Sequence, residues 1–382
     1  MPQAAEGTDV VVVGAGVIGL AIAWQLARAG MAVTVLDPAP AMGASWSAAG
    51  MLAPVTEVGW GEEKLLELNL AAAERYPSFV AELEDATGAD VGYRESGTLS
   101  VAAEADDRAV LDDLLAFQRR LGLHAERLSA RECRGLEPLL SPRVRGGVLV
   151  PGDHQVDNRR LGAALRAGAE GAGAVLVAEK VETIVVGADR VLGARTTDGT
   201  SWRAAQVVLA AGCWSGRAMG LPPGAVPPVR PVKGQILRLR APTDPPLLAH
   251  NLRCQVAGSH LYVVARADGE VVLGATVEEQ GFDTTVTVGA VHDLLRDARE
   301  VLPGIAELEL VETHAGLRPG SPDNAPIIGP APGVGGLVIA TGHYRNGVLL
   351  APVTADAVAE LVVSGHSPAA IGPFDPGRFS CS

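Results

Sequence analysis

A glycine-rich turn near the N-terminus constrains this chain more than any other feature. The turn, Gly14-Ala-Gly16-Val-Ile-Gly19, follows the apolar run Val10–Val13. It leads into an apolar segment, about Val17–Ala29, which we expect to be helical, and then into a second apolar run, Ala32–Leu36. This order predicts a βαβ unit with two parallel strands, because a crossover helix returns the chain in the same direction.

Each glycine of the turn meets a different structural requirement of a dinucleotide-binding site. Gly14 permits the tight turn, Gly16 lets the backbone approach a pyrophosphate, and Gly19 lets the helix pack close to the sheet. The helix N-terminus offers free N–H groups to the anion. Asp37 ends the second strand, where its carboxylate can accept hydrogen bonds from a ribose. The sequence therefore predicts a dinucleotide cofactor.

Charge and cysteine usage exclude several classes of partner. The 382 residues hold 44 acidic and 31 basic side chains, a net charge of −13, which argues against nucleic acid. Cys133, Cys213, Cys254 and Cys381 are scattered without metal-ligand spacing, so we expect no metal and four reduced thiols in a cytoplasmic protein. The uncharged run Val10–Trp24 is shorter than the ~20 residues of a membrane span, and we expect no membrane partner.

The rest of the chain continues the α/β pattern and then changes character. Between Val229 and Leu273 short apolar runs alternate with Pro- and Gly-bearing turns, which indicates a β-rich second domain. The further elements we expect are helices at 62–83, 106–121, 157–170, 288–302 and 347–362, a short helix capped by Ser129 and Glu132, and strands at 174–177, 206–210, 236–239, 261–264, 271–273 and 337–340.

The segment Ala44–Pro54 favours FAD over NAD. Its small residues let the backbone lie against a bulky planar ligand, and Ser45 and Ser47 can hydrogen-bond phosphate or ring atoms. A flexible surface loop is the alternative, but Met51 and Leu52 are unusual choices for such a loop.

At this point the sequence resembles a known family. Five segments in order are similar to glycine oxidases of the thiamine-biosynthesis type, within the D-amino-acid oxidase superfamily of FAD-dependent oxidoreductases. They are the GAGVIG turn, Ala48-Ala-Gly-Met-Leu-Ala53, Arg230-Pro-Val-Lys-Gly-Gln235, Ala315-Gly-Leu-Arg-Pro-Gly320 and Gly342-His-Tyr-Arg-Asn-Gly-Val-Leu-Leu-Ala-Pro352. One departure is Asp37, where most relatives carry Glu; the shorter acid can still hold ribose.

The resemblance implies a discontinuous architecture. It places an FAD-binding Rossmann-like domain at 1–90, 149–227 and 317–382, and a substrate domain on a mixed, largely antiparallel β-sheet at 91–148 and 228–316. It also implies non-covalent FAD. The implied cofactor contacts are Gly14, Gly16, Val17, Ile18, Gly19, Asp37, Ala44, Ser45, Ala49, Gly50, Met51, Val181, His343, Tyr344, Arg345, Asn346, Gly347, Val348 and Leu349. The last seven run from a glycine turn into a helix, whose N–H groups would stabilise the negative charge of reduced flavin.

The resemblance also implies a substrate site for a small amino acid. Arg318 is the implied carboxylate anchor, because a guanidinium binds a carboxylate through two parallel hydrogen bonds. Arg345 is placed near the substrate as well. Tyr262 and His260 alternate on one predicted strand and so point to the same face. The tyrosine is expected to bind the carboxylate and the histidine to line the site, although a lone histidine on a strand is more often structural.

The activity implied is oxidative deamination of glycine and other small amines. Hydride passes from Cα to flavin N5, oxygen accepts the electrons as hydrogen peroxide, and the imine hydrolyses to glyoxylate and ammonia. Orientation and electrostatics suffice, without a strong base. The alternatives are a D-amino-acid or sarcosine-type oxidase or dehydrogenase, an NAD(P)-dependent reductase, and a non-catalytic flavin-binding subunit. A homo-oligomer, dimer or tetramer, is expected from the family.

Overall fold

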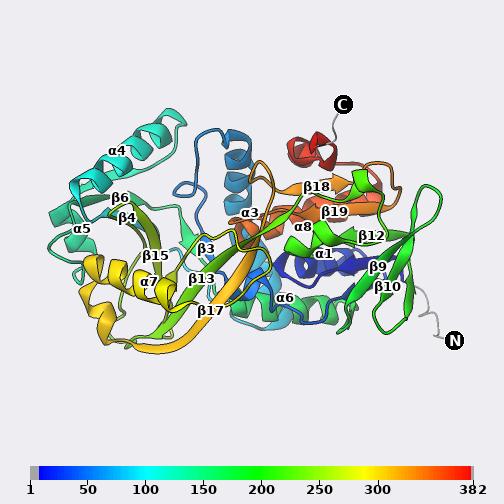
Figure 1. Ribbon diagram of the computed structural model, residues 1–382, viewed down its shortest axis with the longest axis horizontal. Helices are drawn as coiled ribbons and strands as arrows, with labels where there is room; N and C mark the ends of the chain where they lie inside the picture. The colour runs from blue at the N-terminus through cyan, green and yellow to red at the C-terminus, as the bar shows by residue number, and fades with distance from the viewer. Residues whose placement is uncertain (1–7, 380–382) are drawn as a thin grey trace.

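The computed structural model describes residues 8–379, and a largely parallel sheet runs through one half of it (Figure 1). The strand order is β18-β19-β12-β1-β2-β8, and only the β18–β19 pair is antiparallel. The strands are β1 (Val10–Val13), β2 (Val33–Leu36), β8 (Val175–Val177), β12 (Gln206–Leu209), β18 (Ile327–Pro330) and β19 (Leu337–Thr341). The predicted βαβ unit with parallel strands is therefore confirmed.

Both faces of this sheet are covered, as parallel sheets require. On one face lie α1 (Val17–Arg28), α3 (Glu63–Thr87), α6 (Asn158–Gly171) and α8 (Gly347–Ser364), whose apolar side chains share one core with the sheet. The other face packs on a three-stranded antiparallel sheet of β9 (Val181–Val186), β10 (Val191–Thr196) and β11 (Ser201–Arg203). This three-stranded sheet was not predicted.

Helix α8 is long and apolar enough to cross a membrane, with a mean hydropathy of 1.6 over its 18 residues. However, 61% of it is buried inside the protein, where it packs against α1 and α3. A buried core helix passes the same test of composition, so the fold accounts for this hydropathy.

The other half of the molecule is built on an eight-stranded mixed sheet of order β17-β13-β16-β15-β14-β4-β6-β5. Its strands are β4 (Thr98–Ala102), β5 (Glu126–Ser129), β6 (Gly146–Val150), β13 (Arg230–Arg240), β14 (Asn251–Val256), β15 (Ser259–Ala265), β16 (Glu270–Gly274) and β17 (Glu309–Gly320). Only the β4–β14 pair is parallel. The long strands β13 and β17 reach toward the parallel sheet (Figure 1).

Alternation along these strands separates the two faces of the sheet. One face, with Leu252, Val263 and Leu273, shares a core with helix α7 (Val288–Val301). The opposite face, with Ile236 and Val264, packs against Ala49 and Met51 of the predicted cofactor segment. The remaining elements are α2 (Ala44–Ser47), β3 (Met51–Leu52), α4 (Ala105–Arg120), α5 (Ala130–Leu136), β7 (His154–Gln155) and 3-10 turns at 212–217, 223–225, 303–307, 369–374 and 376–379.

Local signals in the sequence were reliable where they involve capping. Ser129 and Glu132 form the predicted capping box of α5, and Asp157 caps α6 by accepting from two backbone N–H groups. The predicted strand at 236–239 is only part of the C-terminal half of β13, because residues 230–235 and Arg240 also pair with β17. The division into two discontinuous domains stays a prediction; β6 and β17 each cross one of its proposed boundaries.

Candidate active site

A cavity of about 1090 Å³ lies between the parallel sheet and the inner face of the mixed sheet. Sites for single small molecules are usually ~300–1,000 Å³, so this cavity has room for a large cofactor and a small substrate. The predicted site residues that line it are Gly14, Gly16, Val17, Ile18, Asp37, Ala44, Ser45, Ala49, Gly50, Met51, Val181, His260, Tyr262, Arg318, His343, Tyr344, Arg345, Asn346, Gly347 and Val348. Gly19 and Leu349 do not line it.

The glycine turn is folded as its sequence predicts. Gly14 has φ 106°, and a Cβ there would stand 2.5 Å from the carbonyl oxygen of Ala210. A Cβ at Gly19 would stand 1.9 Å from the Gly14 carbonyl oxygen, so the glycine at position 19 allows helix α1 to pack close to the turn. Asp37 accepts from the N–H groups of Ala15 and Ala39, each at 2.7 Å. This carboxylate therefore holds the turn itself while it lines the cavity.

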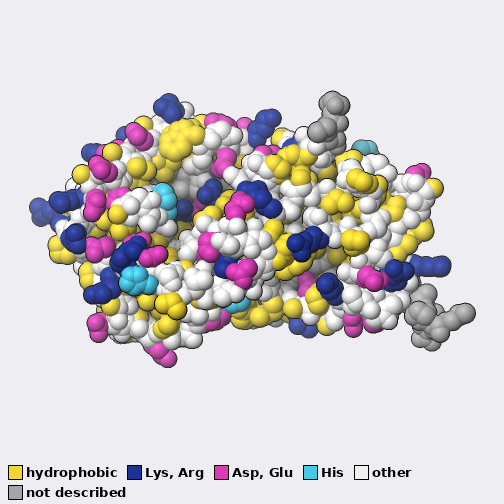
Figure 2. Space-filling view, in the orientation of Figure 1, with side chains coloured by type: hydrophobic (Ala, Val, Ile, Leu, Met, Phe, Trp, Pro, Cys, Tyr) yellow, Lys and Arg dark blue, Asp and Glu magenta, His cyan; other side chains and the backbone are white. Residues whose placement is uncertain are grey.

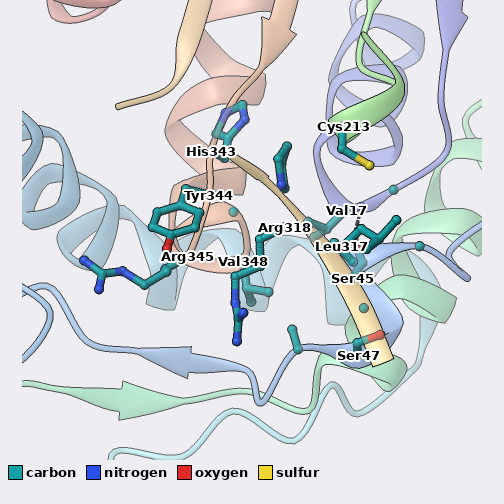
Figure 3. Close-up of a pocket in the computed structure, with 18 of the residues that line it drawn as sticks. Val17, Ser45, Ser47, Cys213, Leu317, Arg318, His343, Tyr344, Arg345 and Val348 are labelled. Atoms are coloured by element: carbon teal, nitrogen blue, oxygen red, sulfur yellow. Dashed lines mark hydrogen bonds between the residues drawn. The ribbon is translucent and has the colours of Figure 1, made fainter. Parts of the chain in front are cut away.

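The start of α1 faces the cavity and is open to an anion. Its N-cap, Gly16, provides no side chain, and the N–H of Val17 donates to Ser45 Oγ at 2.9 Å (Figure 3). The Oγ of Ser47 is buried and has no hydrogen-bond partner within residues 8–379. Gly50 has φ 73°, and a Cβ there would stand 2.0 Å from the carbonyl oxygen of Val156. An unpaired hydroxyl and a close backbone approach both fit a bound ligand along this segment.

The start of α8 forms the opposite side of the cofactor region. His343 is buried, its Nε2 lies 3.1 Å from Thr354 Oγ1, and burial lowers its pKa to about 3, which keeps the ring neutral. Tyr344 has φ 46°, and its N–H donates to Pro319 at 3.0 Å. Asn346 caps α8 without a side-chain hydrogen bond, so the first N–H groups of α8 remain open. Leu349 is packed in the core and can contribute only its backbone to this end.

Arg318 projects from β17 into the cavity (Figure 3). Its Nη1 donates to the carbonyl of Thr276 at 3.1 Å and to that of Lys233 at 3.4 Å, and no carboxylate in residues 8–379 lies within ion-pair distance of it. Tyr262 also lines the cavity, where burial, opposed by Arg318, raises the pKa of its phenol. Gly274 makes room for this ring, since a Cβ there would stand 2.4 Å from the tyrosine hydroxyl. A half-buried guanidinium without a counter-ion is ready to bind an anion.

Two charged residues that the sequence did not suggest, Glu57 and Arg253, also line the cavity. Glu57 forms an ion pair with Arg253, and its Oε2 lies 3.3 Å from Arg345 Nε. Burial alone would raise the pKa of Glu57, but Arg253 and Arg345 together hold it below its usual range. The Arg345 side chain extends away from Arg318 (Figure 3). Arg253 is the one charged residue of strand β14, and this was the available signal for it.

His260 and Cys213 also line the cavity. Partial burial and the nearby Arg253 lower the pKa of His260. Burial raises the pKa of the Cys213 thiol to about 12, so this cysteine stays protonated at neutral pH. Cys133 and Cys254 are buried free thiols, and Cys381 lies outside the described residues.

The fold and the cavity define a dinucleotide-dependent oxidoreductase with a site for a small anion. The chain belongs to the DAO family of FAD dependent oxidoreductases, whose sequence profile matches residues 9–361. The open helix N-termini, the unpaired Ser47 hydroxyl and the close approach at Gly50 fit FAD, the cofactor of this family.

Individual relatives extend this similarity over nearly the whole chain. Glycine oxidase of Geobacillus kaustophilus is 35% identical over 372 residues, which cover 97% of each chain. The bifunctional protein ThiO/ThiG of Trichormus variabilis is 36% identical, but the chain spans only 55% of that longer protein. The crystal structure of the Geobacillus glycine oxidase matches with a TM-score of 0.90 at 34% identity, covering 98% of this chain and 99% of that one.

Proposed function

We propose that this protein is an FAD-dependent glycine oxidase that also accepts other small amino acids. Glycine, oxygen and water would give glyoxylate, ammonia and hydrogen peroxide. The observation that carries the proposal is Arg318, a guanidinium inside a flavoprotein cavity with no carboxylate partner in the described chain. Similarity to glycine oxidases at 35% identity over nearly full length supports glycine as the substrate.

Arg318 would anchor the substrate carboxylate through two parallel hydrogen bonds, which fixes the position of Cα. Tyr262, whose raised pKa keeps it protonated, would donate a further hydrogen bond to the same carboxylate. Bound FAD supplies the two-electron acceptor for the hydride that leaves Cα. Glu57 is kept ionised by its arginine partners and so does not provide a proton. The substrate is thus oriented by charge, and the chain needs no strong base.

The remaining properties of the protein form part of the same proposal. FAD binds non-covalently, since Cys213 and Cys254, which both line the cavity, are held in the unreactive thiol form by burial. Acidic and basic side chains are interspersed on the face in Figure 2, which gives that face no continuous basic surface for nucleic acid. We place the protein in the cytoplasm as a homo-oligomer, dimer or tetramer. The similarity to ThiO/ThiG supports a role in thiamine biosynthesis.

Substrate selection tests this proposal most simply. Peroxide, glyoxylate and ammonia are measured with glycine, sarcosine, D-alanine and D-proline as substrates for the wild-type protein and for Arg318→Ala. The proposal expects turnover with glycine and a large rise in its KM in the variant. Turnover restricted to D-alanine or D-proline would favour the D-amino-acid oxidase alternative, and an unchanged KM would remove Arg318 as the anchor.

A further inference from the structure

Two buried arginines lie behind the cofactor segment, on the side away from the cavity. Arg238 on β13 and Arg266 after β15 are only 1% and 5% exposed, and neither lines the cavity. Their guanidinium groups contact backbone oxygens of residues 46–49, the stretch that leads up to the close approach at Gly50. Burying a cation is unfavourable unless it is well paired, so the presence of two buried arginines requires an explanation.

The arginines bind the carbonyl groups of the segment in sequence. Arg266 Nη2 donates to the Ala49 oxygen at 2.5 Å, while its Nη1 donates to Val156 O at 2.8 Å. Arg238 Nη2 lies 3.2 Å from Trp46 O and 3.4 Å from Ala48 O. The carbonyl oxygens of this stretch are therefore drawn toward the two guanidinium groups and away from the cavity.

Peptide geometry determines where the N–H groups then point. The Ala48–Ala49 and Ala49–Gly50 peptide bonds are trans, and in a trans peptide the N–H is directed opposite to the C=O. The N–H groups of Ala49 and Gly50 thus face the cavity that both residues line. Neither N–H has a protein acceptor in the described part of the chain. Two donors are held open toward the cofactor.

The positive charges of Arg238 and Arg266 and the peptide dipoles act in the same sense, because both favour negative charge in the cavity. Glu270 is the carboxylate in contact with it, at 2.5 Å from Arg238 Nη1 and 3.9 Å from Arg266 Nε. Burial lowers the pKa of Arg266 only to about 10, so it remains charged at neutral pH. The nearby acids Asp157 and Asp268 are engaged by the start of α6 and by Arg160. Glu270 is thus near both cations but is hydrogen-bonded only to Arg238.

We propose that Arg238 and Arg266 are positioning residues that hold the N–H groups of Ala49 and Gly50 toward the flavin ring and thereby favour its reduced, anionic form. Donors that are fixed in advance stabilise developing negative charge without reorganisation. The proposal rests on FAD, the cofactor of the family, and does not depend on which amine is the substrate.

Lysine substitutions test the proposal with little risk of unfolding. Arg266→Lys and Arg238→Lys keep a positive charge, but one ammonium cannot serve both carbonyl groups in the fixed geometry of a guanidinium. The midpoint potential of bound flavin is measured in each holoenzyme by equilibration with a redox dye, without any amine. We expect the equilibrium constant for flavin reduction to fall at least tenfold, which is about 30 mV for a two-electron couple.

A second readout and a matched control separate this role from a merely structural one. Hydrogen exchange of the backbone amides of Ala49 and Gly50 should be slow in the wild-type holoenzyme and at least tenfold faster in both variants. Arg75→Lys, on α3 and paired with Glu82 and Asp356 outside the cavity, should change neither quantity. Folded holoenzymes of both variants with wild-type potential and wild-type exchange would overturn the proposal.

Discussion

Gly234 lies directly against the guanidinium group of Arg318: a Cβ at position 234 would stand 2.3 Å from Nη1 and 2.5 Å from Cζ of that arginine. The two residues are on the paired antiparallel strands β13 and β17. The missing side chain at position 234 therefore leaves the space in which Arg318 reaches the cavity.

Gly234→Ala should consequently displace Arg318 without removing it. Hydrogen bonds to charged groups contribute about 1.5–3 kcal/mol, so the KM for glycine should rise about ten- to a hundredfold while FAD stays bound. Initial-rate kinetics measure this, with Gly224→Ala as the control because nothing lies within 4 Å of a Cβ there. Equal KM values for the two variants would show that Arg318 is not confined by this glycine.

Glu57→Gln should destabilise the protein, because Arg253 and Arg345 would lose the carboxylate that they share. Breaking a buried pair typically costs about 3–5 kcal/mol, and we expect about 2–3 kcal/mol because these side chains are partly exposed. Urea unfolding of the holoenzyme measures the loss. Asp112→Asn, which breaks surface pairs with Arg108 and Arg127, should cost less than about 1 kcal/mol. If the two losses were equal, Glu57 would be an ordinary surface acid.

His343 should make stability depend on pH. Burial lowers its pKa in the folded protein to about 3, whereas an unfolded histidine has a pKa of about 6.5. The unfolded state therefore binds more protons, and this contribution to stability is present above about pH 6.5 and lost as the pH falls toward 3.

In His343→Gln the fall in Tm between about pH 6.5 and 4 should be shallower than in the wild-type protein. His124→Gln changes a histidine whose side chain is 75% exposed and should leave the pH profile unchanged. Parallel pH profiles for wild type and His343→Gln would exclude a neutral, buried His343.

Gly14→Ala should abolish retention of FAD during purification. An alanine at this position would have to keep the backbone at φ 106°, and its Cβ would stand 2.5 Å from the carbonyl oxygen of Ala210. The turn at the start of α1 must therefore shift. Gly30→Ala is the control, since its φ is also positive, 86°, but nothing lies within 4 Å. The control should lose about 1 kcal/mol of stability and keep its flavin. If Gly30→Ala also lost its flavin, backbone strain alone would explain the loss of flavin in Gly14→Ala.

The cavity residues at the starts of α1 and α8 could be found from the sequence, whereas Glu57 and Arg253 could not. The glycine turn and the segment before α8 are runs of consecutive residues, so local patterns suffice to find them. Glu57 and Arg253 are 196 positions apart, and Arg266 is 217 positions from Ala49. Such pairs depend on how the mixed sheet docks on the cofactor segment, which no local pattern encodes. The sheet of β9–β11 was missed because its short strands lack a clear apolar alternation.

Mixing the purified holoenzyme with glycine in the absence of oxygen, while recording the visible absorbance of the flavin, tests whether the protein is a glycine oxidase. We expect the yellow colour to bleach and the admission of air to restore it with one peroxide for each flavin. Arg318→Ala should bleach far more slowly at the same glycine concentration. A yellow holoenzyme that glycine does not bleach at any concentration would contradict the assignment as a glycine oxidase.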